Sequence, residues 1–199
     1  MVPPAYQGVW VRTLLEQGEL RDERTQVYWL QACRWHADLR IPQPAPGEAP
    51  WSADQRQRQQ QGFAGWTEVQ TIDGRDVCSW HREFDLQPPT ADADEGYMHF
   101  ESSERVVETG VHASYLEIWE RLPGSTGRQL ALEMTEPDGT TRRMLIAGEF
   151  ATQVRPRRAA WPADTCAPDT LEQAGKAGEV LVRGPGDVVQ SWQLVEGAL

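Results

Sequence analysis

The chain has 199 residues, of which 39% are hydrophobic and 25% are charged, and its formal net charge is −11. This length and composition fit one domain spanning residues 1–199 with a core of its own, and they argue against a disordered chain. The acidic balance excludes the basic surface that a phosphate backbone requires, so we expect no nucleic-acid partner.

The N-terminal residues, the apolar segments and the cysteine spacing indicate the compartment in which we expect the protein. The sequence does not open with a basic segment followed by an apolar stretch, and it contains no run of about 18 apolar residues. We therefore expect neither export by a signal peptide nor a membrane partner. Cys33, Cys78 and Cys166 lack the spacing of a zinc ribbon or a redox pair. Reduced thiols in the cytoplasm are the expectation that follows.

Segments rich in aromatic and β-branched residues recur along the chain, separated by clusters of Gly, Pro and Asp. This pattern predicts an all-β protein. Turn residues at Asp73-Gly74 and at Pro137-Asp138-Gly139 predict hairpins, the second with alternating apolar residues on its first arm. The predicted strands are at about 7–16, 26–41, 63–72, 77–86, 97–101, 105–109, 111–122, 128–136, 141–150, 152–156, 179–183 and 188–195.

Two segments depart from the β pattern. Ser52 and the glutamine-rich stretch at 53–61 offer an N-cap followed by good helix formers, and Asp169 and Gly175 can cap a second short helix at 169–175. No internal repeat with a period of 20 to 50 residues is visible, which argues against propellers and solenoids.

These elements predict a single antiparallel β-barrel of about 10 strands, because closure removes exposed sheet edges. Gly8-Val9-Trp10 resembles the Gly-x-Trp entry of the calycins, the superfamily of lipocalins and fatty-acid-binding proteins, in which the Trp closes the base of the barrel. Asp38-Leu39-Arg40-Ile41-Pro42 and the run from Arg82 to Pro89 look like pieces of lipocalin-like families. The resemblance implies a lipocalin-like barrel with a ligand cavity. The sequence lacks the Thr-Asp-Tyr segment of typical lipocalins, which argues against an extracellular transport role.

Alternation along the predicted strands sorts side chains into inward and outward sets. We expect the odd residues of 28–41 to face inward, together with the set from Cys78 to Leu86 that includes Phe84, whereas His36 and His81 should face outward. The candidate ligand-binding residues are Trp29, Trp35, Trp80, Arg82, Tyr115, Glu117 and Trp119.

This aromatic interior predicts binding of a small hydrophobic or aromatic ligand whose carboxylate or carbonyl meets Arg82. A filled core in which Arg82 pairs with Glu117 is the alternative. An enzyme is a second possibility, with Tyr115, Glu117 and His81 as acid–base groups, although the residues favour a protein that is not an enzyme.

A third possibility is a protein-interaction module that uses the glutamine-rich helix, the Pro-rich loop, Trp51 and Trp161. The four histidines show no metal-ligand spacing, and no phosphate loop or dinucleotide motif occurs. We therefore expect no metal and no cofactor, and the sequence leaves the oligomeric state open.

Overall fold

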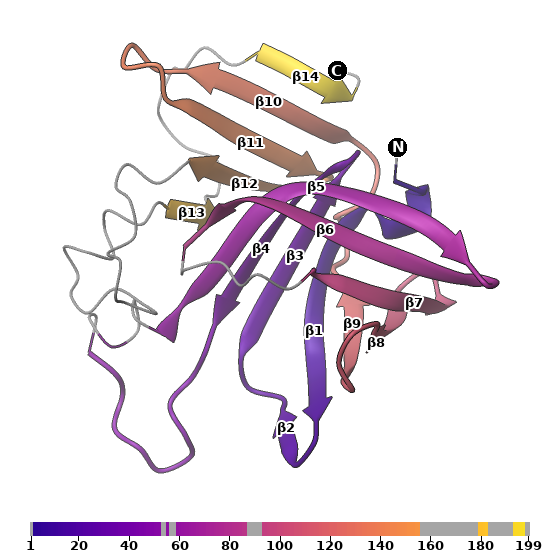
Figure 1. Ribbon diagram of the computed structural model, residues 1–199. Helices are drawn as coiled ribbons and strands as arrows, with labels where there is room; N and C mark the ends of the chain where they lie inside the picture. Colours follow the sequence, from indigo (N-terminus) through magenta and orange to yellow (C-terminus); the bar gives the residue numbers. More distant parts are fainter. Residues whose placement is uncertain are drawn as a thin grey trace.

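The structure is a computed structural model that describes residues 2–52, 55, 59–86, 93–155, 179–182 and 193–197. The fold is all-β, as the sequence predicts. One sheet closes into an antiparallel barrel of eight strands, and a second sheet of five strands lies beside it (Figure 1). In the described part of the chain, no helix is long and apolar enough to cross a membrane.

The barrel strands follow one another in chain order, and pairing of the first with the last closes the ring. A 3-10 turn, η1 (Pro4–Tyr6), precedes them, and the short β2 (Leu20–Asp22) extends β1 as a hairpin. The eight strands are β1 (Gly8–Gln17), β3 (Gln26–Ala32), β4 (Trp35–Ile41), β5 (Gln61–Ile72), β6 (Arg75–Asp85), β7 (Glu95–Ser102), β8 (Arg105–Gly110) and β9 (Leu116–Arg121).

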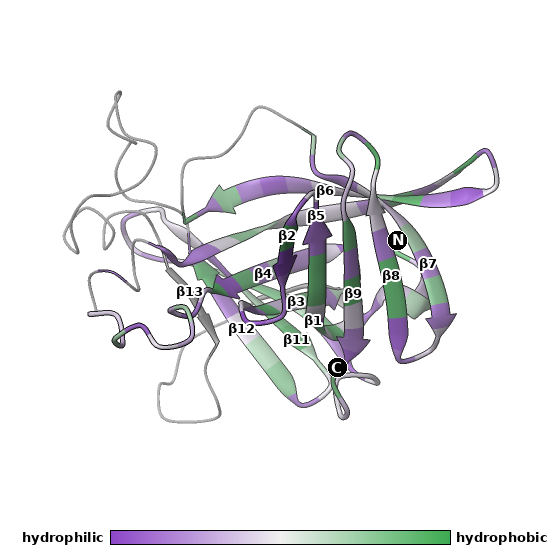
Figure 2. Ribbon diagram, turned by 90° about the horizontal axis from the view of Figure 1, so that it is seen from below, coloured by the Kyte–Doolittle hydropathy of each residue, from purple (hydrophilic) through white to green (hydrophobic). Residues whose placement is uncertain are grey.

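The second sheet has the order β13-β12-β11-β10-β14 and is antiparallel throughout. Figure 2 shows β11 and β12 running past the barrel wall that contains β3. Its strands are β10 (Gln129–Thr135), β11 (Thr141–Ala147), β12 (Phe150–Arg155), β13 (Glu179–Val182) and β14 (Gln193–Gly197). A hydrophobic core between this sheet and the barrel wall buries Val9, Leu30, Ala32, Ala37, Ala64, Ala131, Leu145, Ala147 and Val154.

A separate core fills the barrel itself. Trp10 is completely buried there, its Nε1 donates a 2.7 Å hydrogen bond to the Tyr6 carbonyl oxygen, and the Arg121 guanidinium lies 4.5 Å from its ring centroid. Trp10 thus packs against the N-terminal turn. The buried residues of this core are Val2, Tyr6, Trp10, Val27, Trp29, Cys78, Trp80, Met98, Val106 and Trp119.

Both predicted hairpins are confirmed. Asp73 and Gly74 have φ angles of 53° and 75°, and they join β5 to β6 in a long hairpin that extends past the neighbouring strands (Figure 1, Figure 2). Gly139 has a φ angle of 84° in the turn that joins β10 to β11. Asn, Asp and Gly are the residues that reach these positive φ angles most easily, and their presence is why the sequence predicts both turns.

The segment predicted as one strand at 26–41 is two strands. The chain reverses at Cys33, whose φ angle is 53°, and Gln31 therefore pairs with His36. Paired residues share a face, so inward positions are odd in β3 and even in β4. The expectation that the odd residues of β4 face inward is wrong: Trp35 and Ala37 pack against the second sheet, and His36 is completely buried in the barrel.

A β-bulge produces a similar change in β6. Ala64 pairs with Phe84 while the adjacent Gly65 pairs with Arg82, so Glu83 is the extra residue. Phe84 consequently packs against the core between the sheets rather than inside the barrel, which corrects the inward prediction for it.

The helix predicted at 53–61 is described only in part. Ser52 and Gln55 cap it reciprocally: the Gln55 amide donates to Ser52 Oγ at 3.1 Å, and the Ser52 amide donates to Gln55 Oε1 at 2.9 Å. Gln55 and Gln59 are helical, whereas Gln61 already begins β5. The helix predicted at 169–175 lies outside the described residues.

Candidate functional site

A small cavity of about 20 Å³ lies inside the barrel, at the end where β4 finishes and β5 begins; we call it the mouth cavity. A cavity of this size has room for about one water molecule. Its lining combines aromatic rings with charged groups: Trp29, Asp38, Arg40, Phe63, Trp80, Asp94, Glu108, Glu117 and Trp119.

Six of the seven predicted site residues meet at this end of the barrel. Four of them, Trp29, Trp80, Glu117 and Trp119, line the mouth cavity itself. Their inward orientation follows from strand alternation, because each shares a face with buried residues of its own strand. Whether they bind a ligand stays a prediction.

Tyr115 and Arg82 contact residues that line the cavity. The Tyr115 hydroxyl donates to Glu108 Oε1 at 2.6 Å, and Arg82 Nε donates to Asp94 Oδ2 at 2.9 Å. The Arg82 guanidinium also lies 3.7 Å from the Phe63 ring centroid. Trp35 is the exception: it lies on the outer face of the barrel, with the Arg143 guanidinium 3.6 Å from its ring centroid.

Glu117 is paired, but not with Arg82. Arg12 Nη1 donates to Glu117 Oε1 at 2.6 Å, and Arg12 Nη2 donates to Asp22 Oδ2 at 3.0 Å. Arg12 and Glu117 are both at least nine-tenths buried. Glu117 therefore pairs with Arg12 of β1 and not with Arg82. Alternation along β1 from the buried Trp10 places Arg12 on the inward face, so the sequence contains a signal for this pair.

Glu108 is the most strongly perturbed carboxyl of the mouth cavity. It is 4% exposed, and Trp119 Nε1 donates to its Oε2 at 3.0 Å. Burial, and next the charge of Glu117, raise the pKa of Glu108 to about 8. Burial likewise raises the pKa of Glu117, while Arg40 and Arg12 oppose that shift. At neutral pH the pair therefore holds a proton, and the Arg12 guanidinium 2.6 Å from Glu117 favours the ionised form of that carboxyl.

Glu108 was not among the residues predicted from the sequence. Its signal is the alternation Val106, Glu108, Gly110 in β8, with a charged residue in the middle of a buried face. The glycine at position 96 makes room for it, since a Cβ there would lie 2.7 Å from Glu108 Oε1.

His36 lies in a buried polar chain inside the barrel. Its Nδ1 is 3.0 Å from Thr67 Oγ1, which donates to Gln31 Oε1 at 2.8 Å. Desolvation, followed by the charges of Arg82, His81 and Arg143, lowers the pKa of His36 to about 3, so the ring is neutral. The outward prediction for His36 is thus wrong, whereas His81 is exposed and stacks on Trp66 with ring centroids 3.7 Å apart.

The remaining barrel interior is occupied by aromatic packing. Trp29 contacts three other tryptophan rings, with centroids 6.2 Å from Trp10, 5.5 Å from Trp80 and 5.9 Å from Trp119. Edge-to-face and offset arrangements at these separations are ordinary core contacts. Among the described residues, no group of three or more His, Cys, Asp and Glu side chains is arranged to hold a metal ion.

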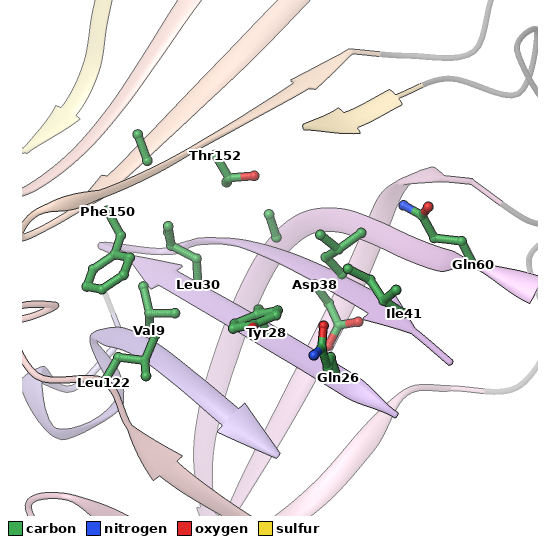
Figure 3. Close-up of a pocket in the computed structure, with 13 residues that line it drawn as sticks. Val9, Gln26, Tyr28, Leu30, Asp38, Ile41, Gln60, Leu122, Phe150 and Thr152 are labelled. Atoms are coloured by element: carbon green, nitrogen blue, oxygen red, sulfur yellow. The ribbon is translucent and has the colours of Figure 1, made fainter. Parts of the chain in front are cut away.

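A much larger cavity, of about 510 Å³, lies outside the barrel and beneath the second sheet; we call it the outer cavity (Figure 3). Val9, Leu122 and Phe150 gather at one end of it, and Gln26, Ile41 and Gln60 at the other. The described residues that line it are Val9, Gln26, Tyr28, Leu30, Ala37, Asp38, Leu39, Ile41, Gln60, Leu122, Phe150, Ala151 and Thr152.

The chain reversal at Cys33 switches the inward positions from odd residues in β3 to even residues in β4, and this switch explains why the outer cavity is apolar. The switch turns Ala37, Leu39 and Ile41 of β4 outward, beside Tyr28 and Leu30 of β3, so the barrel wall presents a hydrophobic face to β12. The sequence predicts that these residues face the barrel interior. A strand buried by a second sheet and a strand buried inside a barrel show the same alternation of apolar and polar residues, so the sequence does not distinguish them.

The comparisons with known proteins extend only to the fold. No protein-family model matches the sequence, and no curated protein matches it. Among solved structures, the chain is similar to an uncharacterized protein of Saccharomyces cerevisiae, YLR301w, with a TM-score of 0.59. The two share 13% sequence identity, over 96% of this chain and 99% of that chain.

Proposed function

We propose that the protein binds a small, largely apolar molecule in the outer cavity and catalyses no reaction of its own. The observation that carries the proposal is a cavity volume of about 510 Å³, with nine of the 13 described lining residues hydrophobic. Ligand pockets typically enclose roughly 300–1,000 Å³ and are lined mainly by apolar side chains. The volume equals roughly 17 water molecules at ~30 Å³ each, which suits two or three rings or a medium alkyl chain.

The proposed ligand position differs from the barrel interior that the sequence favoured. The mouth cavity, where six of the predicted ligand-binding residues meet, is about 20 Å³ and has room for about one water. The closed antiparallel barrel supports an architectural kinship with the calycins, while the size of the two cavities favours a ligand between barrel and second sheet.

An uncharged aromatic probe, N-phenyl-1-naphthylamine, tests the proposal, because its fluorescence rises in apolar surroundings. Leu39→Trp adds bulk to a lining residue that is 8% exposed, and Ile41→Trp does the same near the polar end. We expect each change to weaken probe binding at least about tenfold, which corresponds to about 1.4 kcal/mol. The matched control is Ile72→Trp, because Ile72 is 48% exposed at the tip of the β5–β6 hairpin.

Thermal unfolding of all three variants establishes that they are folded before binding is compared. Equal probe affinity in the wild type, Leu39→Trp and Ile41→Trp would place the probe elsewhere and refute the proposal. So would a wild-type protein that does not bind the probe at all.

The two other possible functions have weaker support. An acid–base enzyme at the mouth cavity has a neutral Glu108 and the Tyr115 hydroxyl, but its cavity admits nothing larger than water. For an interaction module, Trp51 is half-buried, and Trp161 lies outside the described residues.

A further inference from the structure

Thr152, in the middle of β12, contributes a polar atom to the otherwise apolar roof of the outer cavity. Its side chain points from β12 into the cavity in Figure 3. The residue is 3% exposed, and its Oγ1 has no hydrogen-bond partner among the described residues. A buried hydroxyl without a partner destabilises a folded protein, and valine would fill the same space without that penalty.

Thr152 differs from its buried neighbour on the same face of β12, which is apolar. Val154, two residues along the same face of β12, is completely buried and apolar, as expected for a strand that packs on a barrel. A β-branched apolar residue would therefore suit position 152 equally well. The polar atom is explained if something in the cavity forms a hydrogen bond with it.

The charges around the outer cavity restrict what that partner is. Among the described residues, the lining contains no lysine or arginine. The side chain of its one carboxylic acid, Asp38, is on the inward face of β4, where Oδ1 accepts a 2.8 Å hydrogen bond from Arg40 Nε. A carboxylate ligand would thus enter an apolar cavity without a cation to pair with it.

We infer that the ligand of the outer cavity is an uncharged, mainly apolar molecule that carries a hydroxyl or carbonyl oxygen, and that Thr152 Oγ1 hydrogen-bonds that oxygen. This inference rests on the proposed binding function, and it names the chemical class that the site selects. Thr152 is then the residue that distinguishes such a molecule from a pure hydrocarbon of the same shape.

A set of matched bicyclic compounds tests the inference on the full chain. Naphthalene has no polar group, 2-naphthol adds an uncharged hydroxyl, and 2-naphthoate adds a negative charge; each competes with N-phenyl-1-naphthylamine. We expect 2-naphthol to bind about tenfold more tightly than naphthalene, as one net hydrogen bond implies, and 2-naphthoate to bind more weakly than 2-naphthol.

Thr152→Val should reduce 2-naphthol affinity to that of naphthalene and leave naphthalene affinity unchanged, whereas Thr152→Ser should retain most of the preference. The valine variant should also unfold at the same temperature as the wild type or above it, so a loss of binding cannot be attributed to unfolding.

The outcomes separate the two proposals. If naphthalene and the fluorescent probe bind but Thr152→Val keeps the preference for 2-naphthol, the role of Thr152 is refuted and the binding function stands. If 2-naphthoate binds most tightly, the uncharged class is refuted. If none of the compounds binds the wild type, both proposals fail.

Discussion

Glu108 makes the stability of the barrel depend on pH in a direction opposite to that of most carboxylates. In the folded protein, burial and the neighbouring Glu117 raise its pKa from 4.5 to about 8. In the unfolded chain it ionises near its ordinary pKa. Between these two pH values the folded state therefore retains a proton that the unfolded state has released.

The size of the effect follows from linkage. A difference of one bound proton changes the free energy of unfolding by about 1.4 kcal/mol per pH unit. Because the folded pKa is raised, the stabilisation is complete below about pH 4.5, is lost progressively as the pH rises to about 8, and stays lost above it. Glu108→Gln removes this dependence and keeps the shape of the side chain, since its amide can accept from Trp119 and donate to the Tyr115 oxygen.

Urea denaturation followed by tryptophan fluorescence, repeated from pH 5 to pH 9, measures the effect. The slope of unfolding free energy against pH should be less negative in Glu108→Gln by up to about 1.4 kcal/mol per pH unit between pH 5 and pH 8. The control is Glu19→Gln, because Glu19 is exposed and should leave the slope as in the wild type. An identical slope in the wild type and Glu108→Gln would mean that Glu108 is ionised in the folded state, and the reasoning would be refuted.

Two further predictions concern the barrel wall. A Cβ at Gly65 would lie 1.9 Å from the His81 carbonyl oxygen at the bulge, so Gly65→Ala should lower the free energy of unfolding by about 1–3 kcal/mol in urea denaturation; unchanged stability would show that the bulge relaxes freely. Arg12→Met leaves Glu117 buried without its 2.6 Å partner and should cost about 3 kcal/mol at pH 7. Adding Glu117→Gln should recover part of that loss in a double-mutant cycle, and strict additivity of the two changes would contradict the pairing.

Much of the fold was predictable because its signals are local. The hairpins at Asp73-Gly74 and Pro137-Asp138-Gly139 depend on residues that tolerate positive φ, and both turns are where the sequence indicates. The reversal at Cys33 and Arg34 lacks such residues, since no glycine, asparagine or aspartate marks it. Two strands were therefore read as one, and every inward assignment in β4 was inverted.

The candidate site was partly predictable for the same reason. Trp29, Trp80, Glu117 and Trp119 keep the inward positions that alternation predicts, since Trp80 precedes the bulge of β6, and they meet in the mouth cavity. Trp35 follows the unmarked turn and faces the second sheet instead. The sequence did not predict the outer cavity, because the cavity depends on how the two sheets pack against each other, and no local sequence pattern indicates that packing.

The strand β4 separates the two cavities, and Asp38 lines both of them. On one face, His36 and the Asp38–Arg40 pair belong to the polar interior; on the other, Ala37 and Leu39 belong to the apolar wall. A partition one strand thick is held in place by its ladder hydrogen bonds to β3 and β5. A displacement of the outer wall at β4 would therefore move the backbone that carries the Asp38–Arg40 ion pair.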